Sequence, residues 1–174
     1  GDLYYNGYDY ARYYYMAFKY YLMSLMMSNS DAFVKIGDII FEDVFNKGNK
    51  NLSILFYQYA AISYNSTALY KLGDYFYNKF DSDNHYLEAK KFYEMSAYQG
   101  NSDALCKIGE IYLNGFDVDQ NYSKAIEYYE QAALKNNTNA LHFLGNFYSS
   151  GEIFDIDIEN AIQYFTKSAS IHYD

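Results

Sequence analysis

Apolar residues recur along most of this chain at spacings of three, four and seven residues, the period of a helix that buries one face. The clearest stretch predicts one helix over residues 103–114 and a second over residues 122–135. Between them Asn114 is followed by Gly115, and glycine commonly ends a helix because it adopts left-handed backbone angles at little cost. This stretch therefore predicts a hairpin of two helices.

The same pattern returns every 36 residues without an insertion. Four glycines mark the register, each with an alanine five residues before it: Gly37, Gly73, Gly109 and Gly145. A single helix hairpin cannot cover both of its apolar faces, so neighbouring units have to stack on each other. The sequence predicts an all-α fold, a right-handed α/α solenoid of 36-residue helix hairpins.

We expect residues 1–174 to form one solenoid domain of about four and a half repeats. The expected units are a partial repeat at 1–36, followed by 37–72, 73–108, 109–144 and 145–174. The four glycines, 36 residues apart, form a grid, and extending this grid backwards places residue 1 in the middle of a first helix. We therefore expect the chain to be a piece of a longer array. Without a further helix, the last helix would leave part of its Ile162, Phe165 and Ile171 face uncovered. The truncated first unit would do the same at Leu3, Tyr4 and the run 13–15, which predicts end-to-end or swapped self-association.

Composition alone leaves β-structure open, because the chain has 25 tyrosines and aromatic residues favour strands. The helical spacing instead assigns most tyrosines to the seams between helices, where the glycine and alanine positions leave room for a ring. The absence of proline fits uninterrupted helices. A single cysteine excludes an internal disulfide, and no signal peptide is evident.

The repeated motif is Ala-x-x-x-Leu-Gly-x-x-Tyr-x-x-Gly followed by Ala-x-x-x-Tyr-x-x-Ala-Ala, and it resembles the Sel-one-like repeat family, a relative of the tetratricopeptide α-solenoids. The unit at 103–136 carries it most fully, at Ala104, Ile108, Gly109, Tyr112, Gly115, Ala125, Tyr129, Ala132 and Ala133. Lys79 replaces the second glycine in one unit and Ser53 replaces an alanine in another. The resemblance implies a non-enzymatic scaffold for protein partners.

That resemblance leaves several roles open. Family members include the luminal adaptor subunit of a ubiquitin ligase in endoplasmic-reticulum (ER)-associated degradation, fungal cell-wall synthase activators and secreted bacterial proteins. We expect an adaptor of the degradation type. The alternatives are a regulatory activator or signalling modulator that binds a folded enzyme, and a purely structural spacer. The fold does not decide among them.

A binding groove is expected on the first helices, which line the concave side in tetratricopeptide-like solenoids. The residues that follow the grid glycines would face it, together with those three positions further along and one turn residue: Asp38, Phe41, Asp74, Tyr77, Glu110, Leu113, Asn114 and Asn146. Acidic beside aromatic residues suit a peptide that carries Lys or Arg. Two alternatives stay open: the acids simply face solvent, and Asn114 serves its own turn.

Charge and residue spacing argue against other classes of function. The formal net charge is −9, which disfavours a binder of nucleic-acid phosphates. Carboxylates roughly 10 Å apart on successive helices cannot share a metal or a proton. His85, His142 and His172 are isolated, and Cys106 has no base within helical reach. We expect no catalytic residue, metal or cofactor, and contact with membranes only through a partner or through a segment outside this sequence.

Four Asn-x-Ser/Thr triplets are candidate N-glycosylation sites, at Asn51, Asn65, Asn121 and Asn136. They favour the secretory pathway or ER lumen slightly over the cytoplasm. Asn, Ser and Thr are also preferred in turns, so the triplets arise without glycosylation as well.

Overall fold

The computed structural model describes residues 18–24, 29–41, 50–79, 84–151 and 155–171. Within these ranges all regular structure is helical. A short helical segment covers residues 18–24, and the labelled helices are α3 (Ser30–Phe41), α4 (Lys50–Ile62), α5 (Ser66–Tyr77), α6 (His85–Tyr98), α7 (Ser102–Asn114), α8 (Tyr122–Leu134), α9 (Thr138–Ser150) and α10 (Ile158–Ile171). Residues 1–17 and 25–28 of the expected partial first repeat lie outside the described residues.

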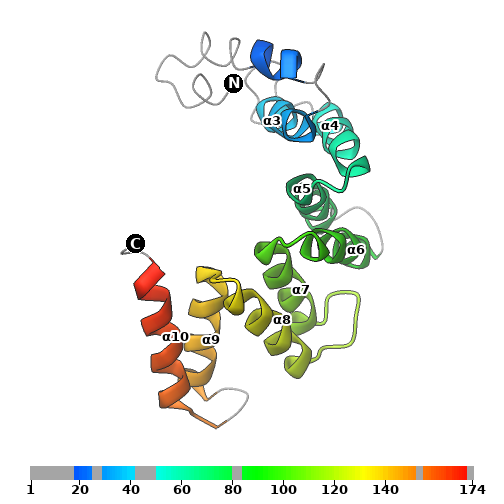
Figure 1. Ribbon diagram of the computed structural model, residues 1–174. Coiled ribbons are helices and arrows are strands. Elements are labelled where there is room, and N and C mark those ends of the chain that lie inside the picture. Colours follow the sequence, from blue (N-terminus) through cyan, green and yellow to red (C-terminus); the bar gives the residue numbers. More distant parts are fainter. Residues whose placement is uncertain (1–17, 25–28, 42–49, 80–83, 152–154, 172–174) are drawn as a thin grey trace.

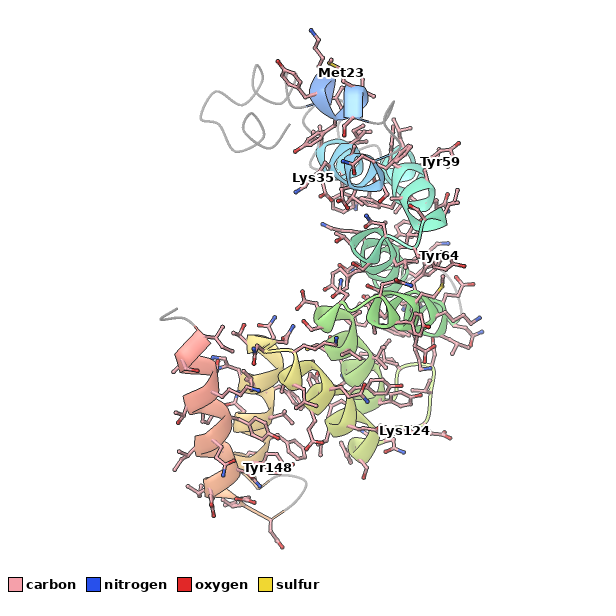
Figure 2. All side chains as sticks on the ribbon, viewed as in Figure 1. Met23, Lys35, Tyr59, Tyr64, Lys124 and Tyr148 are labelled. Atoms are coloured by element: carbon pink, nitrogen blue, oxygen red, sulfur yellow. The ribbon has the colours of Figure 1, made fainter. Side chains whose placement is uncertain are left out.

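Successive helices pack in antiparallel pairs, and each pair packs on the next. The pairs are α3 with α4, α5 with α6, α7 with α8, and α9 with α10. They follow one another around an open arc, with α3 and α5 toward its inner side and α4 and α6 on its outer side (Figure 1). Lys35 extends from the inner side, whereas Tyr59 and Tyr64 lie on the outer side (Figure 2). The predicted all-α solenoid is confirmed.

The glycine grid is explained by an aromatic ring that lies against each glycine. Tyr57, Tyr93, Tyr129 and Phe165 follow the four glycines by 20 residues and pack on them from the second helix of the same pair. A Cβ atom added to Gly73 would lie 2.5 Å from Cε1 of Tyr93, a ring that is fully buried. The glycines therefore let the two helices of each pair approach closely, as the sequence pattern indicated.

Asparagine side chains begin the first helices and also join one repeat to the next. In Asn137 the side-chain oxygen accepts a hydrogen bond from the Ala140 amide, which caps α9. Its Nδ2 donates to Asp103 in the preceding repeat at 2.6 Å. Asn65 makes the same pair of contacts, with Ala68 and with Asp31. These bonds fix the orientation of consecutive first helices relative to each other.

No helix in the described ranges is long and apolar enough to cross a membrane.

Candidate binding surface on the first helices

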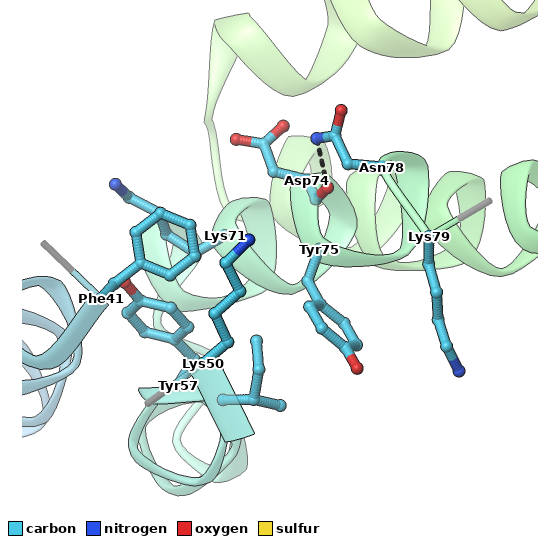
Figure 3. Close-up of a pocket in the computed structure, with 9 residues that line it drawn as sticks. Phe41, Lys50, Tyr57, Lys71, Asp74, Tyr75, Asn78 and Lys79 are labelled. Atoms are coloured by element: carbon cyan, nitrogen blue, oxygen red, sulfur yellow. Dashed lines mark hydrogen bonds between the residues drawn. The ribbon is translucent and has the colours of Figure 1, made fainter. Parts of the chain in front are cut away.

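A hollow lies where the α3/α4 pair meets α5. Its volume is about 680 Å³, and aromatic rings, a carboxylate and lysine side chains converge on it (Figure 3). It brings together two of the predicted groove residues, Phe41 and Asp74. Its lining residues are Phe41, Lys50, Ile54, Tyr57, Lys71, Asp74, Tyr75, Asn78 and Lys79. The Lys50 ammonium stands 5.8 Å from the centre of the half-exposed Phe41 ring.

The predicted acidic residues of this surface accept hydrogen bonds from tyrosine hydroxyls. Tyr57 donates to Asp38 at 2.8 Å, and Tyr93 donates to Asp74 at 2.7 Å. In both pairs the tyrosine is the one whose ring packs on the grid glycine. Each tyrosine ring thus packs on a glycine while its hydroxyl donates to the acid that follows that glycine. Asp38 and Asp74 therefore stabilise the packing of the two helices in their pairs.

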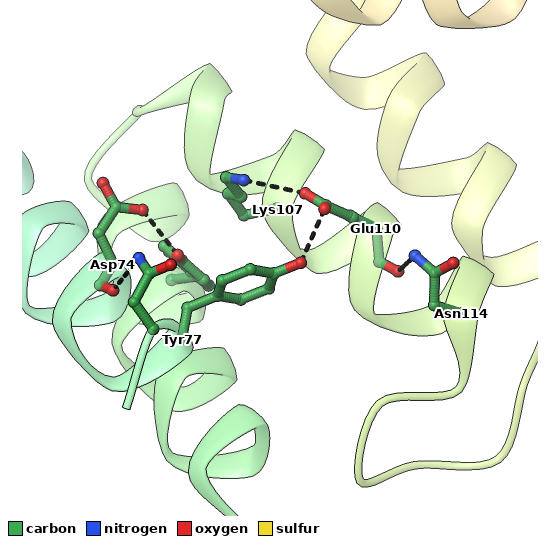
Figure 4. A network of polar contacts seen from close by, with 7 residues as sticks. Asp74, Tyr77, Lys107, Glu110 and Asn114 are labelled. Carbon is green, nitrogen blue, oxygen red and sulfur yellow. Dashed lines mark hydrogen bonds and ion pairs between the residues drawn. The ribbon is translucent and has the colours of Figure 1, made fainter. Parts of the chain in front are cut away.

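Glu110 differs, because its longer side chain reaches the preceding repeat. Its Oε1 accepts a hydrogen bond of 2.7 Å from the Tyr77 hydroxyl, and its Oε2 lies 2.9 Å from the Lys107 ammonium (Figure 4). The Lys107 ammonium also stands 4.8 Å from the centre of the Tyr77 ring. The structure therefore brings together two predicted groove residues, Tyr77 and Glu110, and clamps α5 to α7 through them.

A row of lysines accompanies the acids, and the sequence reasoning missed it. Lys35, Lys71 and Lys107 are 36 residues apart, each three positions before an acid. Lys71 forms an ion pair of 3.2 Å with Asp38 of the preceding repeat. The recurrence was visible in the sequence. It was overlooked because lysine belongs neither to the family motif nor to the apolar pattern.

Burial changes the acidity of the groups in this network. It raises the pKa of the Asp74 carboxyl above its usual value, although the Tyr93 hydrogen bond and the nearby Lys107 and Lys71 ammonium groups act in the opposite direction. Burial, together with the neighbouring carboxylates, also raises the pKa of the Tyr77 and Tyr93 hydroxyls. Both hydroxyls therefore stay protonated and act as donors.

Two smaller hollows occupy equivalent places on this surface, two repeats apart. The first, of about 440 Å³, is lined in part by Asp31, Val34, Lys35, Asp38 and Thr67. The second, of about 380 Å³, is lined by the residues 72 positions later, Asp103, Cys106, Lys107, Glu110 and Asn139, and also by Tyr70, Tyr129 and Phe143. The hollow is thus a recurring feature of the array.

The remaining predicted groove residues do not join this network. The Asn114 side chain donates a hydrogen bond of 2.9 Å to the Glu110 carbonyl in its own helix, a local bond of the helix end. The Leu113 carbonyl accepts from Gln120 in the following loop at 2.8 Å. Asn146 is exposed on α9.

The second recurring hollow contains the chain's cysteine. Burial raises the pKa of the Cys106 thiol to about 12, so the nucleophilic thiolate is scarce near neutral pH. Its sulfur lies 3.5 Å from Oδ1 of Asn137. Among the residues that the structure describes, no cluster of three or more His, Cys, Asp or Glu side chains is arranged to hold a metal ion. The groups on this surface are suited to charge pairing and hydrogen bonding.

The candidate glycosylation sites differ in how free their amides are. Asn51, in the first turn of α4, and Asn136, in the turn after α8, are exposed. Asn121 caps α8 through its side-chain oxygen. The Nδ2 atom of Asn65, to which a glycan would be attached, donates hydrogen bonds to Ser30 and Asp31.

Comparison with solved structures gives close matches to repeat proteins of the same shape. A Sel1 repeat protein from Oxalobacter formigenes superposes with a TM-score of 0.80 at 25% identity, over 92% of this chain and 71% of that one. A protective antigen of uropathogenic Escherichia coli strains that displays an SLR fold gives a TM-score of 0.74 at 26% identity, over 90% of this chain and 34% of the antigen. A sel1 repeat protein from Klebsiella pneumoniae subsp. pneumoniae gives 0.64 at 21% identity, over 88% and 74%.

Comparison with curated protein sequences gives no match. A model of the Sel1 repeat matches residues 66–101, 102–137 and 138–171, which correspond to the pairs α5/α6, α7/α8 and α9/α10. Proteins built from this repeat generally act in protein–protein interaction and are typically non-enzymatic scaffolds. Both the matched residues and the superposed arc identify the chain as a member of the Sel1 repeat family.

Proposed function

We propose that this chain is a scaffold that binds an extended protein segment along the exposed side of α3, α5, α7 and α9. The observation that carries the proposal is the recurrence of the same hollow two repeats apart, with five equivalent lining positions. A recurring hollow on a stacked array suits a partner that runs along the array and places one side chain in each hollow.

The charges of the two hollows favour basic partner side chains. The lining of each hollow holds two carboxylates and one ammonium group: Asp31 and Asp38 with Lys35, then Asp103 and Glu110 with Lys107. At the first hollow Lys71 also pairs with Asp38. Asp31 and Asp103 are exposed, and each accepts one amide hydrogen bond, from Asn65 and Asn137. Asp38 and Glu110 already accept tyrosine hydroxyls and pair with lysines. A Lys or Arg of the partner would therefore pair with Asp31 or Asp103.

The distance between the hollows sets the spacing of these side chains. First helices of consecutive repeats pack roughly 10 Å apart, so the hollows are separated by roughly 20 Å. An extended chain advances roughly 3.3 Å per residue, so two basic residues about six positions apart would reach both hollows.

The test is titration of a fluorescent peptide that carries two Arg residues six positions apart, against a matched peptide with Glu in their place. We expect the Arg peptide to bind better. The double substitution Asp31→Asn with Asp103→Asn should weaken its binding by about two- to tenfold, because each exposed charge pair contributes less than about 1 kcal/mol. The control is Glu88→Gln on the outer helix α6, which removes a charge elsewhere and should leave the affinity unchanged.

Equal binding of the two peptides, or equal binding by the double variant and the unmodified chain, would overturn the proposal. The assay also separates the biological roles. An adaptor and a regulator of a folded enzyme both require such a surface, whereas a spacer does not. None of the three matched structures is described as a degradation adaptor, so the proposed function does not extend to that narrower role.

A further inference from the structure

The connecting segments at the two edges of the solenoid differ in charge, while Asp31 and Asp103 lie at helix starts beside the turns. Because successive helices run in opposite directions, the loops within the pairs lie along one edge and the turns between pairs lie along the other. The loop between α7 and α8 carries Asp117 and Asp119, and the segment before α10 carries Asp155 and Asp157. The turns between pairs, at residues 63–65, 99–101 and 135–137, contain no acid and a single basic residue, Lys135.

This second edge, the turn edge, also presents a row of apolar side chains. Ile62, Tyr98 and Leu134 are the last residues of α4, α6 and α8, and they are 36 positions apart. Their exposed fractions are 74%, 89% and 79%. Single exposed apolar residues are ordinary, but an evenly spaced and almost fully exposed row is typical of a contact surface.

A hollow opens beside the middle member of this row. Its volume is about 520 Å³, and Tyr64, Glu94, Met95, Tyr98 and Gln99 line it. Glu94 is its only charged lining residue in the described part of the chain, and Lys90 pairs with it at 2.6 Å on a partly exposed site. Tyr64 lies on the outer side of the arc, away from the proposed peptide surface (Figure 2).

The next turn carries side chains that complement this hollow. Leu134 projects into solvent and is followed by Lys135, whose ammonium group has no hydrogen-bond or ion-pair partner among the described residues. The same edge therefore carries an apolar projection with a cation, and an apolar hollow whose carboxylate, Glu94, is paired only with Lys90 of its own helix and is partly exposed. A surface with both features can bind a second copy of itself.

We propose that the turn edge binds a second copy of this chain about a two-fold axis, with Leu134 of each copy in the hollow beside Tyr98 of the other. The row is evenly spaced, so two antiparallel rows match in register. The two Tyr98 side chains then meet at the axis, and Leu134 of one copy lies between Tyr98 and Ile62 of the other. The hollow opens at this place, so Leu134 enters it and Lys135 lies close to Glu94 of the second copy.

Charge and area both favour a second copy as the occupant of this edge. Each chain carries a net charge of −9, and an approach through the turn edges keeps the acidic loops of both copies apart. Tyrosine side chains bury roughly 150–250 Å² each, so Tyr64 and Tyr98 with Ile62, Met95 and Leu134 approach the roughly 800 Å² per partner of a standard interface.

The proposal is tested by sedimentation velocity of the whole chain over a wide range of concentrations. We expect a reversible monomer–dimer equilibrium. Leu134→Asp should weaken the dimer by at least about tenfold, because it places a charge in the apolar centre of the contact. Since Leu134 is exposed, circular dichroism should show an unchanged fold.

Charge exchange makes the test specific for the proposed pairing. Lys135→Glu alone and Glu94→Lys alone should each weaken the dimer, and the double variant should restore it. The control is Lys124→Glu, at the opposite end of α8 from Leu134, which should have no effect (Figure 2).

A chain that is monomeric at every concentration overturns the proposal. So does a dimer that Ile162→Asp abolishes and Leu134→Asp leaves intact, because the ends of the array would then associate. The proposal is also wrong if the chain stays monomeric but binds phosphatidylcholine vesicles, and Leu134→Asp abolishes that binding. The turn edge would then be a lipid-binding surface. None of these outcomes depends on the Arg-peptide assay, so the proposed function stands or fails separately.

Discussion

The hydrogen bond between Tyr93 and Asp74 allows a direct test of the idea that the acids of this surface hold buried tyrosines. Tyr93→Phe removes only the hydroxyl and leaves the fully buried ring on Gly73. The substitution removes the 2.7 Å hydrogen bond that the Tyr93 hydroxyl donates to the half-buried carboxylate of Asp74. A bond to a charged group contributes about 1.5–3 kcal/mol, and the partial exposure of Asp74 favours the lower end, about 1.5–2 kcal/mol.

The matched background is Asp74→Asn, which keeps an oxygen to accept the tyrosine hydroxyl but removes the charge. There Tyr93→Phe breaks only a neutral hydrogen bond, worth about 0.5–1.5 kcal/mol. We therefore expect the hydroxyl to contribute about 1 kcal/mol more to the free energy of unfolding when residue 74 is Asp. Urea unfolding of the four proteins measures this difference, provided that their m-values agree. Equal costs in the two backgrounds would refute the reasoning.

The acidity of Asp74 gives the same experiment a pH dependence. Burial raises its pKa above the usual 3.8, so the folded state keeps the proton to a higher pH than the unfolded chain does. Asp74 therefore favours folding at pH values below its unfolded pKa. That contribution to the free energy of unfolding is lost as the pH rises from the unfolded pKa through the folded pKa. The cost of Tyr93→Phe should shrink as the pH falls through the folded pKa, because a neutral acid needs a hydrogen-bond donor less. The Asp74→Asn background should show neither effect.

Three further outcomes follow from the packing. Gly73→Ala should lower the free energy of unfolding by about 1–3 kcal/mol, and more than Gly109→Ala, because the nearest ring atom would lie 2.5 Å from the new methyl group instead of 2.9 Å; urea unfolding compares them. Asn137→Ala should cost about 1 kcal/mol more than Asn101→Ala in the same assay, because only the first also removes side-chain bonds to the preceding repeat. Alkylation of Cys106 by iodoacetamide at pH 8 should be far slower in the folded chain than in urea, and equal rates would contradict the burial that raises its pKa.

The fold was largely predictable because one short pattern carries it. The grid glycines and the aromatic rings 20 residues later are the two sides of a single contact, so their spacing encodes the pairing of helices. The predicted helices at 103–114 and 122–135 agree with α7 and α8 to within one residue at each end. Local sequence and packing point to the same answer here, which is why the helical period outweighs the strand preference of tyrosine.

The polar contacts of the candidate surface were less predictable. Position on the grid places Asp38, Asp74 and Glu110 on one side, but it does not say which donor each of them meets. One extra methylene turns Glu110 toward Tyr77 of the preceding repeat, whereas Asp74 meets Tyr93 of its own pair. Such choices depend on side-chain length and on the angle between repeats, and neither is encoded in a 36-residue spacing.

The last repeat shows which of these residues depend on one another. At its equivalent positions the acid becomes Asn146, the tyrosine becomes Phe165 and the lysine becomes Phe143. The carboxylate and the hydroxyl disappear together, which fits the bonded pairs Tyr57–Asp38 and Tyr93–Asp74, since a buried hydroxyl without an acceptor is costly. The third pair differs, because Glu110 bonds Tyr77 instead. The loss of the lysine changes the surface itself: the Phe143 ring stacks on Tyr129 with their centres 3.8 Å apart, inside the second recurring hollow. The proposed binding surface is therefore charged at α3, α5 and α7 and aromatic at α9. This asymmetry gives a bound segment a direction. The segment should carry an apolar side chain after its second basic residue, where it would meet Phe143.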